Sequence, residues 1–242
     1  MESVSNLKIS LTNHTLNITI NRPEMLNCFG ILELDEIGKA VRMAEQNADV
    51  RAVVFRGAGN QSFSTGMDLK QFDSLDQKRL AHWIKKGHDV FNSIESCSKP
   101  TLAAIQGYAL GGGLELALSC DIRIASESAR LGSPELQHGW LPGWGGIIRL
   151  KKLIGEAKAK EIIYFGEHMS AEEAHHYGLV NFLVKTIHLE NKTSEIAQKL
   201  VDLNPDTFAM AKAALSKPIT SSTVSQHDIW FDMLGTMYEK NK

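Results

Sequence analysis

Alternating and helical patterns of apolar residues divide the first half of the chain into short strands and amphipathic helices. Apolar and polar residues alternate over 7–11 and 16–20 around a polar turn, which predicts an antiparallel hairpin. Over 31–44 the apolar residues recur at helical spacing with charged residues opposite them, which predicts a helix with one buried face. A strand, a helix and a strand are then expected at 51–57, 76–95 and 101–105. This alternation predicts an α/β fold.

The second half of the chain is mainly helical in its patterns. A short strand is expected over 121–125, and residues 130–132 are expected to pair beside it. Ser170 and Glu173 have the spacing of a capping box, and Gly178 follows as a helix stop. Further helices are expected over 145–154, 156–165, 189–203, 205–216 and 221–238.

Three consecutive glycines, 111–113, stand immediately before a predicted helix. The free amides at a helix start carry partial positive charge, so their natural guest is a negatively charged oxygen that approaches the backbone closely. Glu115 falls in the first turn of this helix, and a second acid, Glu135, follows in a loop rich in proline and glycine. Two acids beside an anion cradle suggest proton transfer next to an oxyanion.

Each of these features also has an ordinary structural explanation. Glu115 alone is typical of a helix-start carboxylate that faces water, Glu135 alone of a loop charge, and a glycine triplet of close helix packing. The combination favours catalysis. Neither GxGxxG nor GK[ST] is present, which argues against a nucleotide loop, and Ser64 and Ser133 lack a base at motif spacing.

The composition narrows the possible partners. The 242 residues are 43% hydrophobic, enough for one large domain or a core with a small appendage, and the formal net charge is −2. No Lys/Arg block appears, which argues against nucleic acid or an acidic membrane as a partner. Cys28, Cys97 and Cys120 lack metal-ligand spacing, and no apolar run approaches the roughly 18 residues of a spanning helix. We expect a soluble, cytoplasmic protein without a metal site, whose partner is a small molecule or another protein.

Five sequence blocks resemble hallmark segments of one enzyme family. The most distinctive are Phe-Ser-Thr-Gly-Met-Asp-Leu-Lys at 63–70, the glycine-rich block at 107–121 and the Ser-Pro-Glu block within 132–150. With the blocks at 21–27 and 171–181, they are similar to the enoyl-CoA hydratase/isomerase (crotonase) family. The resemblance implies a spiral of strand-strand-helix repeats with an acyl-CoA site over 1–185. It also implies a C-terminal helical region over 186–242 that assembles homotrimers, often paired into hexamers.

The resemblance also implies roles for individual residues. The backbone amides of Met67 and Gly112 would form the oxyanion hole, where each donor is worth on the order of 3 kcal/mol. Glu115 would activate a water that the Gly143 amide supports, and Glu135 would protonate Cα. Trp144 would line the acyl pocket. The residues expected to contact CoA are Met25, Leu26, Ser64, Gly66, Asp68, Leu69 and Lys70.

Several functions stay open at this point. Retention of both acids favours an enoyl-CoA hydratase, which needs no metal or redox cofactor, with CoA as part of the substrate. An isomerase needs one acid, and an acyl-CoA decarboxylase needs the oxyanion hole and a proton donor. A non-catalytic protein that binds CoA or RNA is the alternative from another class, and the low net charge weighs against RNA. Bulky residues at Met67, Trp140 and Trp144 suggest a short or flat acyl group.

Overall fold

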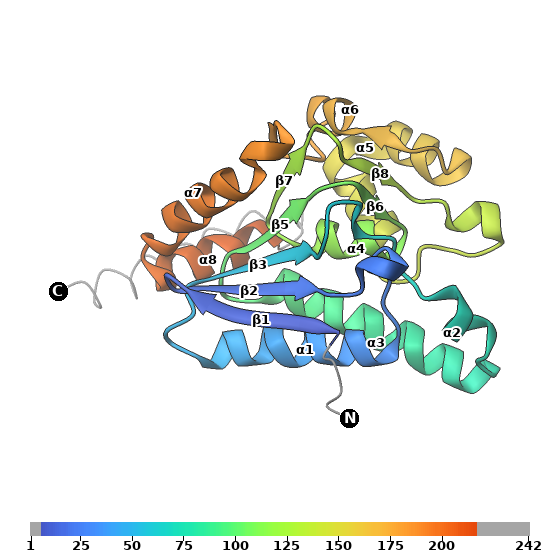
Figure 1. The fold of residues 1–242 in the computed structure, drawn as a ribbon, viewed down its shortest axis with the longest axis horizontal. Coiled ribbons are helices and arrows are strands. Elements are labelled where there is room, and N and C mark those ends of the chain that lie inside the picture. Colours follow the sequence, from blue (N-terminus) through green and yellow to red (C-terminus); the bar gives the residue numbers. More distant parts are fainter. Residues whose placement is uncertain (1–5, 217–242) are drawn as a thin grey trace, which may run out of the picture.

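A computed structural model describes residues 6–216, which form a six-stranded sheet, a smaller second sheet and helices on both faces of the larger one (Figure 1). The larger sheet has the order β1-β2-β3-β5-β7-β10. Its strands are β1 (Leu7–Thr12), β2 (Thr15–Ile20), β3 (Ala52–Gly57), β5 (Thr101–Ile105), β7 (Ile122–Ser126) and β10 (Phe182–Val184). Only β1 and β2 pair antiparallel, and the other neighbours are parallel.

The second sheet has the order β4-β6-β8-β9. Its strands are β4 (Ser62–Ser64), β6 (Tyr108–Leu110), β8 (Arg130–Gly132) and β9 (Met169–Ser170). The predicted pairing of 130–132 beside 121–125 is therefore wrong, because β8 pairs with β6 and β9. The reason is the spiral itself: successive turns stack on one another, so β5 pairs with β7 in one sheet while β6 pairs with β8 in the other.

The helices connect these turns. They are α1 (Ile31–Gln46), α2 (Leu69–Asp73), α3 (Gln77–Ser96), α4 (Gly112–Ser119), α5 (Gly146–Phe165), α6 (Ala171–His176), α7 (Leu189–Val201) and α8 (Pro205–Ser216). Short 3₁₀ turns are η1 (Pro23–Met25), η2 (Glu135–His138) and η3 (Thr186–His188). The hairpin, the helix capped at Ser170 and the helical pair broken at Gly155 are confirmed. The helix expected over 221–238, and with it the last part of the predicted trimerisation region, lies outside the described residues.

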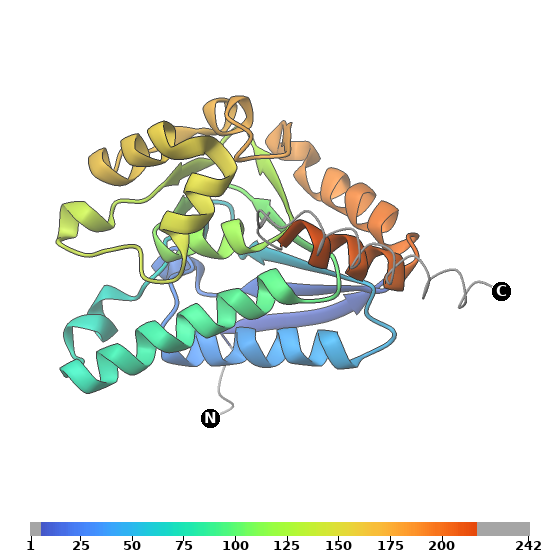
Figure 2. The same ribbon diagram turned by 180° about the vertical axis from the view of Figure 1, so that it is seen from behind.

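The main hydrophobic core lies between the sheet and a layer of helices. In both views α1 and α3 run side by side against one face of the sheet (Figures 1 and 2). The opposite face of β3, β5 and β7 packs against α7 in a smaller cluster that includes Leu102, Ile124 and Ile196. All of β5 is buried, as expected for a parallel strand covered on both faces. The division of the chain at residue 185 stays a prediction, and α7 beyond it shares this core with the strands.

Candidate active site

Helix α4 begins where two chain segments approach each other too closely for side chains. A Cβ added to Gly113 would lie 2.1 Å from the carbonyl oxygen of Ser64, and one added to Gly66 would lie 2.5 Å from the amide nitrogen of Gly112. Every residue of α4 is buried. The glycines therefore allow the helix start to pack directly on the loop that follows β4.

The amides of Met67 and Gly112 are both available at this contact. Phe29 and Met67 form a parallel β-bridge. The Phe29 carbonyl accepts a hydrogen bond from the Asp68 amide at 3.1 Å, and the Phe29 amide donates one to the Gly66 carbonyl at 2.8 Å. In such a bridge the residue between the two bonds, Met67, directs its own amide away from the partner. Within residues 6–216 neither the Met67 nor the Gly112 amide donates to a protein acceptor. The dipole of α4 adds positive potential at the Gly112 end.

Glu115 lies in the first turn of α4 and is buried, with 3% of its surface exposed. Its Oε1 accepts hydrogen bonds from the backbone amides of Trp144 and Gly146, both at 2.8 Å. Burial and, to a smaller extent, the charge of Glu135 raise the pKa of Glu115 to about 7, against the opposing effect of the two amides. The carboxyl is therefore held firmly in place while its affinity for a proton is increased.

Glu135 begins the 3₁₀ turn η2 and is the second acid of the site. Its Oε2 accepts a hydrogen bond of 2.7 Å from the Ser133 hydroxyl. Its Oε1 is buried and has no protein partner within the described residues, and it would lie 3.4 Å from a Cβ on Gly111. Burial raises the pKa of Glu135, and the hydrogen bond from Ser133 opposes the rise.

These groups together can support proton transfer. Carboxyls with raised pKa values can accept and deliver protons at higher pH than exposed acids, and the charge of Glu135 contributes to the raised pKa of Glu115. The two unoccupied amides can stabilise a negative oxygen formed beside them.

Comparison with known proteins identifies the family. The model of the enoyl-CoA hydratase/isomerase family matches residues 11–242. The chain belongs to this family. It is 40% identical over 200 residues to a short-chain-enoyl-CoA hydratase of Clostridium acetobutylicum, covering 83% of this chain and 77% of that protein. It is 34% identical over 219 residues to a crotonyl-CoA hydratase of Syntrophomonas wolfei, covering 90% of this chain and 84% of that protein.

Solved structures of the enoyl-CoA hydratase/isomerase family share the fold. An enoyl-CoA hydratase from Bacillus anthracis superimposes with a TM-score of 0.91 at 36% identity, covering 96% of this chain and 90% of that one. An enoyl-CoA hydratase from Thermoplasma volcanium also gives 0.91, at 30% identity, covering 99% of this chain and 95% of that one. The predicted crotonase-like spiral of strands and helices is thereby confirmed.

Two amides of the loop from η2 to α5 hold Glu115, a contact that the sequence did not indicate. The amides that hold Glu115 belong to Trp144 and Gly146. The predicted role of Gly143 concerns a bound water, so it stays a prediction. The Trp144 side chain, only 4% exposed, lies in the core against the start of α4. Its predicted place in an acyl pocket also stays a prediction.

Two side chains of the predicted CoA segment have structural partners. The Ser64 hydroxyl donates to the Asn27 carbonyl at 2.8 Å and accepts from the Gly66 amide at 3.0 Å. Asp68 is buried, pairs with Arg22 at 3.2 Å and caps α2. These side chains brace the loop, so any contact with CoA from this stretch falls mainly to its backbone and to other side chains.

The remaining predicted CoA residues lie on two segments that are joined by backbone hydrogen bonds. Leu69 is 49% exposed and Lys70 is exposed at the start of α2. Met25 and Leu26 are half-buried, and the Leu26 carbonyl accepts from the Thr65 amide at 3.1 Å. The structure thus brings the two predicted CoA segments side by side, while their role in binding stays a prediction.

Arg149 is a positioning residue that the sequence did not reveal. Its guanidinium is buried and donates to the Trp144 carbonyl at 2.7 Å, to Glu95 at 2.9 Å and to Asn92 at 2.8 Å. It therefore ties the loop that holds Glu115 to helix α3. A signal was present, because a cation near a helix start opposes the helix dipole and needs a specific partner.

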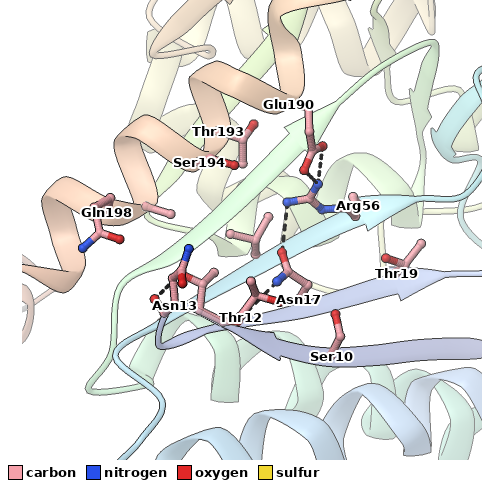
Figure 3. A pocket seen from close by; sticks show the side chains of 13 residues that line it. Ser10, Thr12, Asn13, Asn17, Thr19, Arg56, Glu190, Thr193, Ser194 and Gln198 are labelled. Atoms are coloured by element: carbon pink, nitrogen blue, oxygen red, sulfur yellow. Dashed lines mark hydrogen bonds and ion pairs between the residues drawn. The ribbon is translucent and has the colours of Figure 1, made fainter.

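A polar groove elsewhere on the molecule lacks this chemistry. It lies where α7 overhangs β1 and β2, and its central cation, Arg56, is paired with Glu190 and with Asn17 (Figure 3). Among the described residues that line it, Glu190 is the only acid. Among residues 6–216, no cluster of potential metal ligands occurs and no helix is apolar and long enough to cross a membrane.

Proposed function

We propose that the protein is an enoyl-CoA hydratase, which adds water across the 2,3-double bond of an enoyl-CoA thioester and gives the 3-hydroxyacyl-CoA. The observation that carries the proposal is the pair of acids, buried Glu115 and half-buried Glu135, both with raised pKa values, beside two amides without protein acceptors among the described residues. The hydratases among its relatives support the same assignment.

The thioester oxygen would lie between the amides of Met67 and Gly112. Addition of water at C3 moves negative charge onto this oxygen as an enolate forms, and each preorganised donor lowers the barrier by about 3 kcal/mol. The helix dipole of α4 acts in the same direction. Both donors are backbone groups, so the side chain of Met67 shapes the site without taking part in the reaction.

The two acids would divide the proton transfers. Glu115 accepts a proton from water as the oxygen bonds to C3, and Glu135 donates a proton to C2 as the enolate collapses. The amides of Trp144 and Gly146 occupy Oε1 of Glu115, which leaves Oε2 for the water. Burial keeps a proton on Glu135 to higher pH than on an exposed acid. Exchange with solvent then restores both groups.

CoA would extend along the paired segments that include Met25, Leu26 and residues 64–70. Gly143 would support the attacking water through its amide. Assembly into homotrimers or pairs of trimers, a cytoplasmic location and the absence of any further cofactor are part of the same proposal and rest on the family resemblance.

The test is hydration of crotonyl-CoA, followed by the loss of enoyl absorbance. Glu115→Gln and Glu135→Gln should each lower kcat by roughly 10²- to 10⁴-fold, because each removes one proton transfer. Glu156→Gln, at an exposed acid on α5, serves as the control and should retain wild-type turnover. Near wild-type turnover in either site variant would refute the two-acid mechanism.

Product analysis separates hydration from related reactions. Offered a 3-enoyl-CoA and a malonyl-type thioester, an isomerase would return the 2-enoyl-CoA and a decarboxylase would release carbon dioxide. The proposed hydratase should act on crotonyl-CoA in preference to both. If calorimetry detects no binding of any CoA thioester, the protein is not an enzyme of this kind.

A further inference from the structure

The indole of Trp144 fills the space between the start of α4 and helix α3. A Cβ added to Gly112 would lie 2.4 Å from Cζ3 of this indole, and a Cβ added to Gly87 would lie 2.3 Å from its Cε2 and Nε1. The indole thus spans from one glycine to the other. Gly87 lies inside α3, where glycine is unfavourable, so its lack of a side chain is explained by the ring that packs on it.

Other rings hold the Trp144 indole in this position. Phe29 stacks on it with 5.7 Å between centroids, and Phe91 and Trp83 meet it edge to face at 5.4 and 6.0 Å. All three of these side chains are fully buried. These three rings and the two glycines restrain the indole on several sides.

The backbone of Trp144 is fixed as well. Its amide donates to Glu115, and its carbonyl accepts from Arg149. The indole therefore begins at the residue that holds one catalytic acid and ends against Gly112, whose amide we assign to the thioester oxygen. With the thioester oxygen at that amide, the indole would lie in the protein interior beside the reacting carbons.

A second aromatic contact narrows the site toward α2. Phe72 of α2 and Trp140 of the loop after η2 meet edge to face with 4.1 Å between their centroids. Trp140 is 38% exposed, so this pair lies near the surface, whereas Trp144 lies in the interior. An acyl chain leaving the two acids thus meets aromatic rings in both directions.

We propose that Trp144, seated on Gly87, sets the acyl-chain length that this protein accepts and restricts it to short, flat 2-enoyl groups such as crotonyl. The inference rests on the proposed function, because it takes the acyl chain to run from the Met67 and Gly112 amides past Glu115. A longer acyl chain would need the volume that the indole fills. The aromatic rings that contact the indole oppose its displacement.

The test measures binding of two saturated thioesters, butanoyl-CoA and decanoyl-CoA, by calorimetry. Saturated chains undergo no hydration, so the result does not depend on the catalytic mechanism. The wild-type protein should bind butanoyl-CoA more tightly. Trp144→Leu should shift the affinity ratio toward decanoyl-CoA by about tenfold or more, since each newly buried methylene is worth about fourfold. Trp144→Phe, a smaller change in volume, should shift the ratio in the same direction by less.

Ile94→Val is the matched control, because Ile94 is fully buried on the same helix as Gly87. It should leave the affinity ratio unchanged. Equal binding of both thioesters by the wild-type protein, or no shift in folded Trp144 variants, would overturn the length limit. A wild-type protein that prefers butanoyl-CoA yet hydrates no enoyl-CoA would refute the proposed function and still support the length limit.

Discussion

Replacement of Glu115 by glutamine should make the protein more stable at alkaline pH while it abolishes most of the activity. The folded state holds this carboxyl with a pKa of about 7, against an ordinary value of 4.5, because the group is buried and lies near the charge of Glu135. A raised pKa in a folded acid means that the native state binds more protons than the unfolded state between these two values. Stability therefore falls as pH rises through this window.

The magnitude follows from the shift. Each pKa unit corresponds to about 1.4 kcal/mol, so ionisation of Glu115 costs the folded state about 3 kcal/mol well above pH 7. Most of this cost, roughly 2 to 3 kcal/mol, develops between pH 5 and pH 8. Glutamine has no such titration, and its side-chain oxygen can accept the same two amide hydrogen bonds. Any constant cost of its NH₂ group cancels when the two pH values are compared.

The assay is urea denaturation of the wild-type and Glu115→Gln proteins at pH 5 and pH 8, at one protein concentration. The variant should gain roughly 2 to 3 kcal/mol relative to wild type between the two conditions. Glu156→Gln is the control. Lys151 and Lys160 lower the pKa of Glu156 to about 2, so this acid is largely ionised in both states over the whole window and its replacement adds no pH dependence there. A difference for Glu115→Gln that does not change with pH would refute the reasoning.

Three further predictions concern the supports of the site. Ser133→Ala removes the hydrogen bond that lowers the pKa of Glu135, so the alkaline limb of the pH–rate profile should move to higher pH, and an unmoved limb would argue against Glu135 as the proton donor. Gly87→Ala should destabilise the wild-type protein by about 1–3 kcal/mol but be tolerated in a Trp144→Leu background. If the effects of the two substitutions on the free energy of unfolding, measured in urea, add within about 0.5 kcal/mol, the packing described is wrong. Gly113→Ala should lower the free energy of unfolding by at least about 2 kcal/mol, because its Cβ would lie 2.1 Å from a carbonyl oxygen of β4. The melting temperature should fall accordingly, and an unchanged melting temperature would count against this close approach.

The periodic elements could be predicted from the sequence because their signals are local. The hairpin of β1 and β2 follows from alternation around a polar turn, and in the structure Asn13 and His14 adopt the positive φ angles of a two-residue hairpin turn. Helix α3 begins after Asp76, whose side chain caps the helix by accepting a hydrogen bond from the Arg79 amide. An aspartate just before an apolar helical pattern is typical of such a cap. By contrast, β4 and α2 were missed, since elements of three and five residues are too short to show a period.

The two acids could be proposed from the sequence, but their properties could not. Glu115 and Glu135 were selected for their place near a glycine-rich helix start and for the family resemblance. The pKa shift of Glu115 depends on burial by several distant segments and on the charge of Glu135. The hydrogen bonds to its Oε1 come from Trp144 and Gly146, and no local pattern in the sequence marks these residues as its partners.

The sequence by itself determined the order of elements, the glycines that open the start of α4 and the identity of the acids, because each depends on neighbours along the chain. Only the tertiary structure decided which strand pairs with which, that Arg149 braces the loop and that the Trp144 indole packs on Gly87. These contacts join residues far apart in sequence. They depend on how the turns of the spiral stack, and no local pattern records that stacking.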